Sequence, residues 1–487
     1  MKKATRTISG VTPVAVMAKP FPCPGKCVYC PSSPEAPKSY TVESPAVLRA
    51  RKCDFDAKKQ VELRLKTLAD MGHTLEKVEL IVMGGTFLAY PQEYQYQFIK
   101  DCYDALNTRQ AADLEEAKRL NGTAEHRCVG LCIETRPDFC GEVQIRRMLD
   151  FGTTRVELGV QTLDDDIHRL TKRGHGVSEV ISATRLLRDC GFKVYYHWMP
   201  GLPGTTPEHD LELSRKLFDD ECFRPDGIKL YPTLVVVGSE LENWYRDNRY
   251  QPYDDEEMIS LLVNIKALIP KYVRIPRLMR DIPSKFIIAG CKDLALRGTI
   301  RKRMSQAGIR CNCIRCREYG HRLRDGWIIG EPRLNRMDYE TYGGEEIFLS
   351  FEDTNETLFG LLRLRVNKGV QKPYVGVLSP PLVGARKLGG DKSLPYNYGF
   401  QASSNTDLAL VRELHIFGPE VPLGERQEQA AQHQGLGEKL LREAERIARE
   451  EFHVGRLNIL SGVGARDYYR SLDYELEGAY MVNELQI

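Results

Sequence analysis

The chain has 487 residues, of which 42% are hydrophobic and 28% charged, as in an ordinary soluble globular protein. This length allows about two to four domains, each with its own core. No segment approaches the roughly 20 consecutive apolar residues of a membrane helix. The basic start, MKKATRTISG, also lacks the apolar run of a secretory signal. We therefore expect no membrane partner and a cytoplasmic location.

The net charge of +2 conceals an uneven distribution of charge along the chain. From Lys271 to Arg324 there are fifteen Lys or Arg residues against three acids, a surplus of +12, so the remainder sums to −10. One basic segment on a mildly acidic body predicts a docking surface for a polyanion. The alternative is a solvated face without a partner.

Short β-branched runs alternate with helix-like segments through the first half of the chain. This alternation predicts a parallel sheet, and the number of units predicts a closed or partly closed barrel. Such barrels carry their chemistry on the loops that follow the strands. We place this barrel in residues 1–270, with a basic linker, residues 271–340, continuing from it. The predicted strands are 14–18, 78–83, 129–134, 155–160, 194–199, 227–231 and 272–278, and two clear helices are 58–71 and 178–190.

A different pattern begins after the basic linker, and we assign residues 341–487 to a separate α/β domain. Residues 345–366 read as paired strands around a DTNET turn. Residues 367–407 are rich in Gly, Pro and Ser and are expected to form an insertion or a long loop. A strand (408–417), a helix (436–451) and another strand (456–461) follow.

Three cysteines, Cys23, Cys27 and Cys30, form a C-x3-C-x2-C cluster directly after the first predicted strand. Three thiolates can hold three irons of a [4Fe-4S] cubane and leave the fourth iron without a protein ligand. This spacing resembles that of the radical S-adenosylmethionine enzymes, in which the open iron binds S-adenosylmethionine. A structural zinc site, which requires a fourth ligand, is the alternative.

A glycine pair follows the second predicted strand, in the sequence Gly84, Gly85 and Thr86. It resembles the glycine-rich edge that accepts the methionine amino group of S-adenosylmethionine in that family. By itself, a glycine pair is also compatible with a simple tight turn.

The segment QHQGLG (432–437) fits a Q-x-x-G-x-G pattern and opens a helix. Glycines allow the chain to approach a pyrophosphate closely, and the amides at a helix N-terminus favour its charge. The pattern resembles the coenzyme A site of the GCN5-related N-acetyltransferases. That resemblance implies that a splayed strand binds the pantetheine arm of acetyl-CoA, that the glycine motif holds its pyrophosphate, and that a tyrosine meets the thioester. The matching residues are Glu413, Leu414, His415, Ile416, Leu436, Gly437, Glu438 and Tyr469, although core packing is the simpler explanation for a tyrosine here.

A second cysteine trio, Cys311, Cys313 and Cys316, lies inside the basic linker. No glycine edge accompanies it, so a structural zinc site is expected, with His321 or Cys291 as the candidate fourth ligand. A zinc-pinned loop of this charge is a plausible platform for RNA phosphates. The candidate RNA-binding residues are Arg297, Arg301, Lys302, Arg303, Arg310, Arg315 and Arg317.

Long strings such as TRTISG, EKVELIVMGGTF, MPGLPG, RELHIFG and SGVGARDYYR resemble the catalytic subunit of Elongator in its stand-alone prokaryotic form. The resemblance covers nearly the whole chain. It implies an α/β protein with a partial (β/α) radical S-adenosylmethionine barrel followed by a GCN5-related N-acetyltransferase domain. It also implies that Lys77 lies near acetyl-CoA between the two halves and that Lys77 and Tyr469 are the catalytic residues, although a surface lysine would be preferred from sequence alone.

The activity implied by this resemblance is synthesis of carboxymethyluridine at the wobble base of tRNA, with S-adenosylmethionine and acetyl-CoA. A deoxyadenosyl radical would remove hydrogen from the acetyl methyl group, and the resulting carbon radical would add to uridine in the anticodon stem-loop. An unactivated methyl group has no useful acidity, so a radical initiator supplies what side chains cannot. The main alternative is a protein lysine acetyltransferase with a structural iron–sulfur cluster. A homodimer is also possible.

Overall fold

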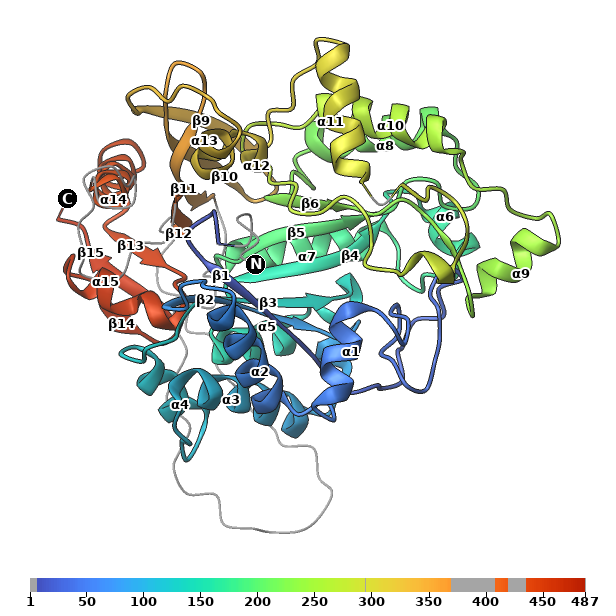
Figure 1. Cartoon of the computed structure of the whole chain (residues 1–487). Helices are drawn as coiled ribbons and strands as arrows, with labels where there is room; N and C mark the ends of the chain where they lie inside the picture. Colours follow the sequence, from blue (N-terminus) through green and yellow to red (C-terminus); the bar gives the residue numbers. More distant parts are fainter. Residues whose placement is uncertain (1–6, 294, 369–407, 419–434, 487) are drawn as a thin grey trace.

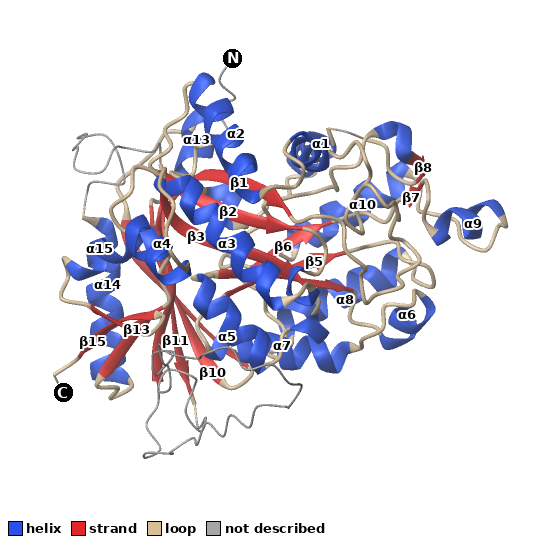
Figure 2. Ribbon diagram, turned by 90° about the horizontal axis from the view of Figure 1, so that it is seen from below, coloured by secondary structure: helices blue, strands red, loops and turns tan. Residues whose placement is uncertain are grey.

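The computed structural model describes residues 7–293, 295–368, 408–418 and 435–486. Two large sheets dominate this part of the chain and lie side by side in Figures 1 and 2. The insertion expected at 367–407 falls largely outside the described residues, as do Gln432, His433 and Gln434 of the glycine motif. No helix among the described residues is long and apolar enough to cross a membrane.

The first sheet has six parallel strands in sequential order, which confirms the partial barrel. Alternate residues of each strand, such as Val78, Leu80 and Val82 of β2, join the apolar core under the covering helices. The strands are β1 (Thr12–Met17), β2 (Lys77–Met83), β3 (Arg127–Thr135), β4 (Arg155–Gln161), β5 (Lys193–Trp198) and β6 (Gly227–Leu230). The helices are α1 (Pro45–Lys52), α2 (Ala57–Asp70), α3 (Gln92–Asn107), α4 (Leu114–Asn121), α5 (Glu142–Phe151), α6 (Asp165–Leu170), α7 (Val177–Asp189) and α8 (Pro207–Asp219).

The seventh predicted strand, 272–278, is not a strand in the structure. It follows β6 through only two isolated parallel bridges, Gly227 to Arg274 and Leu230 to Leu278. Pro276 lies between these bridges, and a proline has no N–H group to continue a hydrogen-bond ladder. The segment therefore closes the open edge of the half-barrel without forming a regular strand.

The second sheet has seven strands in the order β14-β15-β13-β12-β11-β10-β9. It begins with β9, earlier in the chain than the domain boundary expected at 341, because β9 pairs along its length with β10. The strands are β9 (Arg333–Thr341), β10 (Gly344–Glu352), β11 (Leu358–Asn367), β12 (Leu408–Ile416), β13 (Arg456–Ile459), β14 (Glu475–Glu477) and β15 (Tyr480–Glu484), and the helices are α14 (Leu436–Arg446), which continues into a π-helical turn (Ile447–Glu451), and α15 (Arg466–Arg470).

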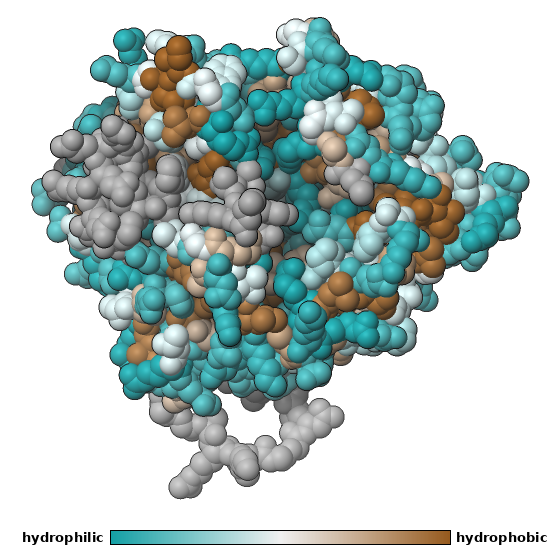
Figure 3. Space-filling model, in the orientation of Figure 1, coloured by the Kyte–Doolittle hydropathy of each residue, from teal (hydrophilic) through white to brown (hydrophobic). Residues whose placement is uncertain are grey.

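Short elements connect the two large sheets along the chain, some of them before the basic linker and some within it. They are α9 (Glu240–Arg246), α10 (Asp255–Ala267), α11 (Leu296–Gln306), α12 (Ile314–Arg317) and α13 (Tyr319–Arg324), together with the two-stranded sheet of β7 (Val235–Val236) and β8 (Ile287–Ala289). The face seen in Figure 3 is mostly hydrophilic, with apolar side chains gathered near α13 and β9. Trp327 and Ile328 are exposed there.

Buried ion pairs join the two sheets. Arg412 of β12 donates to both carboxylate oxygens of Asp226, each at 2.7 Å, and also to Glu346 at 2.7 Å. Arg365 of β11 donates to Asp189 of α7 at 2.6 Å. Both arginines are fully buried, so their charges are stable only when paired. These contacts fix the second sheet against the amino-terminal ends of the barrel strands.

Candidate active site

The first cysteine trio opens into a cavity of about 120 Å³ at the carboxyl ends of the barrel strands. Cys27 and Cys30 are buried and Cys23 is partly exposed. Gly85 and Thr86, which follow β2, line the same cavity. Further walls come from the ends of β3, β4 and β5 and from the segment after β6, namely Glu134, Thr135, Arg136, Gly159, Gln161, His197, Tyr231, Arg277 and Arg280. The barrel therefore gathers the trio and the glycine edge at the catalytic end of such folds.

An arginine in the segment after α6 places a positive charge beside the first trio. Arg173 is buried and donates to the Cys27 sulfur at 3.4 Å. A hydrogen bond from Cys30, with the charge and hydrogen bond of Arg173, outweighs burial and lowers the pKa of Cys27 to about 4. A backbone N–H of Gly25 donates to the sulfur of Cys23 at 3.4 Å. The same hydrogen bond, together with burial, raises the pKa of Cys30 well above its usual value. Thiolate is the form that binds metal, so Cys27 is the member of this pair already favoured as a metal ligand.

The cavity also presents polar groups that lack partners. Several lining side chains carry a buried nitrogen or oxygen with no hydrogen-bond partner in the structure: Tyr29, Thr135, Arg136, Gln161, Arg173 and Arg280. Buried polar groups in folded proteins are normally satisfied. This set of donors and acceptors fits a polar, charged ligand such as an amino acid joined to a nucleoside.

The floor of the cavity is a group of charged side chains that sequence reasoning missed. Glu134, Glu157 and His197 bring their ligand atoms within 4.8 Å of one another. Lys229 of β6 bonds both carboxylates, at 3.1 Å to Glu134. The available signal was charge at alternating positions of strands that otherwise read as apolar, as in RVELGV and GIKLYP. Interiors of (β/α) barrels are usually filled by branched apolar residues, so this polar interior is a specific feature of the chain.

The predicted acetyl-CoA strand, β12, separates from its parallel neighbour. It pairs with β13 only from Ala409 to Val411, whereas its pairing with β11 continues to Ile416. The backbone beyond Val411 is therefore open on one side. The side chain of Glu413 is buried in ion pairs with Arg363 (2.8 Å) and Lys193 (3.4 Å), and the His415 ring is hydrogen-bonded to the Ser9 carbonyl at 2.8 Å. These side chains are engaged within the protein, so only the backbone here is open to a ligand.

The glycine motif begins α14 as expected. Gly435 has a left-handed backbone with φ of 68°, and Leu436, Gly437 and Glu438 form the first turn of α14. A Cβ atom at Gly437 would lie 2.9 Å from the hydroxyl of Tyr468. Tyr468 is therefore the tyrosine beside this turn.

Tyr469, the tyrosine expected to meet the thioester, lies in the core. It is 6% exposed and packs within the apolar cluster of the second sheet, and its burial raises the pKa of the phenol. Neighbouring positions of the short helix α15 point to different sides, so the sequence spacing could not choose between the two tyrosines.

The two predicted half-sites lie at opposite ends of the half-barrel. Lys77 is the first residue of β2 and Lys193 the first of β5, so both mark the amino ends of strands, and Lys193 contacts β12. His197, four residues beyond Lys193 on β5, already lines the cavity, so about 13 Å separates that end from the cavity at strand spacing. Among the described residues, none from the second sheet lines the cavity.

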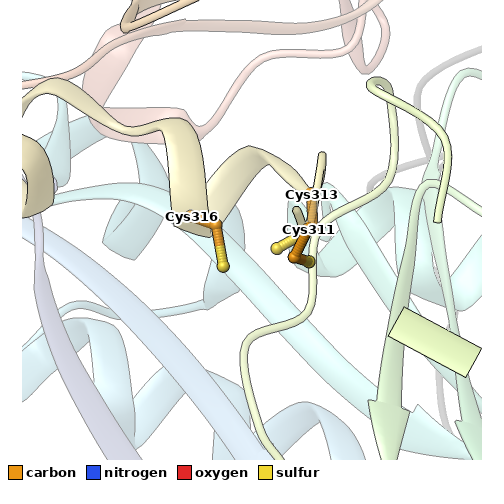
Figure 4. Close-up of side chains that lie close together, drawn as sticks. All are labelled: Cys311, Cys313 and Cys316. Atoms are coloured by element: carbon orange, nitrogen blue, oxygen red, sulfur yellow. The ribbon is translucent and has the colours of Figure 1, made fainter. Parts of the chain in front are cut away.

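The second cysteine trio forms a tight group, with all three sulfurs within 4.8 Å of one another and directed toward a common point (Figure 4). A zinc bound to three thiolates at about 2.3 Å needs this proximity. Neither predicted fourth ligand joins the group: His321 lies 3.7 Å from Glu318, and Cys291 is buried in the core. Lys266 of α10 instead donates to Cys311 at 3.2 Å.

The candidate tRNA-binding residues separate into three sets. Arg317 is fully buried and bonds the backbone oxygens of Asn312 and Lys271, so it is unavailable to RNA and its assignment is corrected. The ion-paired residues are Arg301, Arg303 and Arg310, which contact Asp325, Glu256 and Glu356 respectively. Lys302 is exposed, and Arg297 and Arg315 lie near the second trio.

Comparison with known proteins defines the class first. Residues 22–217 match the Radical SAM superfamily, and residues 225–306 match the Radical_SAM C-terminal domain. The protein is therefore a radical S-adenosylmethionine enzyme, and its cavity residues fit the implied [4Fe-4S] cluster and S-adenosylmethionine, because three sulfurs and unpartnered polar groups converge there.

Relatives over the full length define the family. The chain is 59% identical to the tRNA uridine(34) acetyltransferase of Dehalococcoides mccartyi over 100% of both chains. It is 39% identical to Elongator complex protein 3 of Homo sapiens, covering 99% of this chain and 86% of that protein. The solved archaeal Methanocaldococcus infernus Elp3 with an N-terminal deletion aligns with a TM-score of 0.82 at 43% identity, covering 98% and 100%. The chain belongs to this tRNA uridine(34) acetyltransferase and Elongator complex protein 3 family, and it is an enzyme of this kind.

Proposed function

We propose that the protein carboxymethylates the wobble uridine of tRNA, using S-adenosylmethionine and acetyl-CoA. The observation that carries this proposal is the presence, in one rigidly joined chain, of a cysteine-lined barrel cavity and an open strand edge beside a glycine-capped helix. Family membership supports modification of uridine 34. The radical route and the use of acetyl-CoA are inferences from the two sites.

In the barrel, Cys23, Cys27 and Cys30 would hold the [4Fe-4S] cluster. When bound, the cluster and S-adenosylmethionine supply a carbon radical that can remove hydrogen from a methyl group. The chain orients this chemistry: Gly84 and Gly85 keep the backbone after β2 in conformations with φ of 142° and 82°, which few other residues adopt. Buried polar groups of Gln161 and Arg136 are available to the cofactor.

In the second sheet, the separation of β12 from β13 supports a GCN5-related acetyltransferase fold. The open backbone of Glu413 to Ile416 would bind the pantetheine arm of acetyl-CoA, and the amides of Leu436, Gly437 and Glu438 at the start of α14 would hold its pyrophosphate. Tyr468 is the tyrosine next to this turn.

The distance between the sites adds a requirement to this proposal. For the acetyl methyl group to reach the cavity, the pantetheine arm must extend about 13 Å along the barrel interior, past Lys77 and Lys193. The polar lining of that interior, which includes Glu79, Arg155 and Glu157, suits a polar chain better than a packed apolar core would.

The basic linker would bind tRNA phosphates. A zinc held by Cys311, Cys313 and Cys316 would brace the loop that carries Arg315. Electrostatic contacts of this kind position nucleic acid without reading its sequence.

Anaerobic reconstitution followed by mass spectrometry of tRNA nucleosides tests the function. The proposal expects carboxymethyluridine only when S-adenosylmethionine, a reductant and acetyl-CoA are all present, together with 5′-deoxyadenosine. A protein lysine acetyltransferase with a structural cluster is the second candidate, favoured by the open β12 edge alone. It predicts acetylated lysine peptides whether or not S-adenosylmethionine and reductant are added, and unmodified tRNA.

A further inference from the structure

A histidine on the cavity floor is held in one orientation by a buried carboxylate. His197 is the next-to-last residue of β5 and lines the cavity. Its Nε2 lies 3.1 Å from a carboxylate oxygen of Glu157 on the adjacent strand β4. Glu157 is 1% exposed, and its charge is balanced by Lys229 and by Arg155. The ring of Tyr231 packs edge-on against the imidazole at 5.2 Å.

This contact sets which ring nitrogen carries hydrogen. A carboxylate only accepts hydrogen bonds, so Nε2 of His197 must be the donor to Glu157. An imidazole with its hydrogen on Nε2 keeps a lone pair on Nδ1. Among the described residues, Nδ1 has no hydrogen-bond partner. A histidine oriented by a carboxylate, with its second nitrogen open, is the usual arrangement of a general base.

Other titratable groups in the cavity already have partners. Glu134 accepts from Tyr40 at 2.9 Å and from Lys229 at 3.1 Å. Asp281 is paired with Arg277 at 2.7 Å. The three cysteines are assigned to iron. Of the other cavity side chains, the Lys38 ammonium has no acceptor and the phenols of Tyr29, Tyr40 and Tyr231 are weak acids, so His197 is the cavity group, within the described residues, that offers an open basic nitrogen to a substrate.

The proposed reaction needs such a base. When a methylene radical derived from the acetyl group bonds to C5 of uracil, the unpaired electron moves to C6 and C5 still carries its hydrogen. The ring regains its double bond only when the C5–H bond breaks, its proton is removed, and one electron leaves to an acceptor of the iron–sulfur class. We propose that Nδ1 of His197 takes this proton, an inference that rests on the proposed function. His197 is thus a catalytic residue and Glu157 the residue that positions it.

The test compares His197→Gln with wild type and with His209→Gln. His209 is a matched control, because its Nε2 also contacts a carboxylate, Asp164, at 2.9 Å, but it lies outside the cavity. Each reconstituted enzyme receives tRNA, acetyl-CoA, S-adenosylmethionine and reductant under anaerobic conditions. Both 5′-deoxyadenosine and carboxymethyluridine are measured, with iron content as a check on folding.

We expect His197→Gln to form 5′-deoxyadenosine at a rate near that of wild type while carboxymethyluridine falls about 100-fold or more, the usual contribution of a general base. With tRNA deuterated at uracil C5, the residual product of His197→Gln should form more slowly than with protonated tRNA, because proton loss has become rate-limiting. His209→Gln should match wild type in both products.

Two results would overturn the assignment. Equal loss of both products would show that His197 serves the cofactor, and unchanged carboxymethyluridine would show that proton removal does not need it. Wild-type enzyme that forms 5′-deoxyadenosine without modified uridine would contradict the proposed function itself, which separates that failure from failure of the histidine assignment.

Discussion

The two cysteine trios use the same ligands in opposite surroundings. Cys23, Cys27 and Cys30 lie at the rim of a cavity, and their sulfurs do not form a tight group. Cys311, Cys313 and Cys316 converge within 4.8 Å, and Lys266 lies against them. Spacing in the sequence is similar, but the first trio lines a cavity in the barrel, whereas the second lies near the surface, where Cys316 is exposed. The proposal therefore assigns a catalytic cluster to the trio that lines the cavity and a structural metal to the trio whose sulfurs lie close together.

The largest difference between the trios should appear in cofactor cleavage. Cys27→Ala removes an iron ligand, so we expect 5′-deoxyadenosine formation to fall to the level seen without enzyme. Cys222→Ala, a cysteine outside both trios, should behave like wild type. Anaerobic assays with iron analysis check this. Substantial cleavage by Cys27→Ala would show that the first trio is not the cluster site.

Removal of zinc should act on stability instead. Because metal that binds only the folded state stabilises it by mass action, loss of zinc from the second trio should lower the free energy of unfolding by about 3 kcal/mol. The measurement is thermal unfolding of Cys313→Ala and wild type, with metal content determined by mass spectrometry. Equal melting temperatures at different zinc contents would contradict a structural role.

The cavity end should show its own pH dependence of stability. Asp210 accepts from the Gly201 N–H at 2.7 Å, in the loop after β5, and its burial raises the pKa of the carboxyl to about 6. A carboxyl whose pKa is higher in the folded than in the unfolded protein makes stability fall as pH rises, here between about pH 4 and 6. Asp210→Asn should therefore be more stable than wild type by about 2 kcal/mol near pH 8 and similar near pH 4.

Urea unfolding at both pH values tests this, with Asp247→Asn, a change at an exposed aspartate, as control. A constant difference between Asp210→Asn and wild type at all pH values would contradict the assignment. Loss of zinc from the second trio should leave this pH dependence of stability unchanged, because Asp210 lies at the cavity end of the barrel.

The smallest effect concerns RNA binding near the second trio. Arg315 forms no ion pair among the described residues, and burial with the neighbouring charges of Arg297 and Arg274 lowers the pKa of Arg315 to about 10. A cation crowded by like charges is suited to bind phosphate. Arg315→Ala should weaken tRNA binding a few-fold and reduce the slope of log affinity against log salt by about 1. Lys26→Ala, beside the first trio, should leave the slope nearly unchanged. A similar loss of tRNA affinity in both variants would contradict a binding role specific to the region of the second trio.

Several site features followed from local spacing. The strand runs from β1 to β6 were read from the sequence because β-branched segments alternate with helical periodicity, and the trio after β1 follows from the position of its cysteines. The features that the sequence did not predict correctly also depend on neighbouring residues. The segment 272–278 has strand composition, but Pro276 interrupts its ladder. Tyr468 and Tyr469 are adjacent, so only packing shows which one is buried.

The sequence by itself determined the barrel strands, both cysteine trios and the glycine turn before α14, because periodicity, thiol spacing and glycine conformation act over a few residues. Only the tertiary structure decided that Lys266 lies beside the second trio, that β12 leaves β13 after Val411, and that His197 meets Glu157 in the cavity. These contacts join residues distant in the chain or on different strands, and long-range packing sets them rather than local propensity.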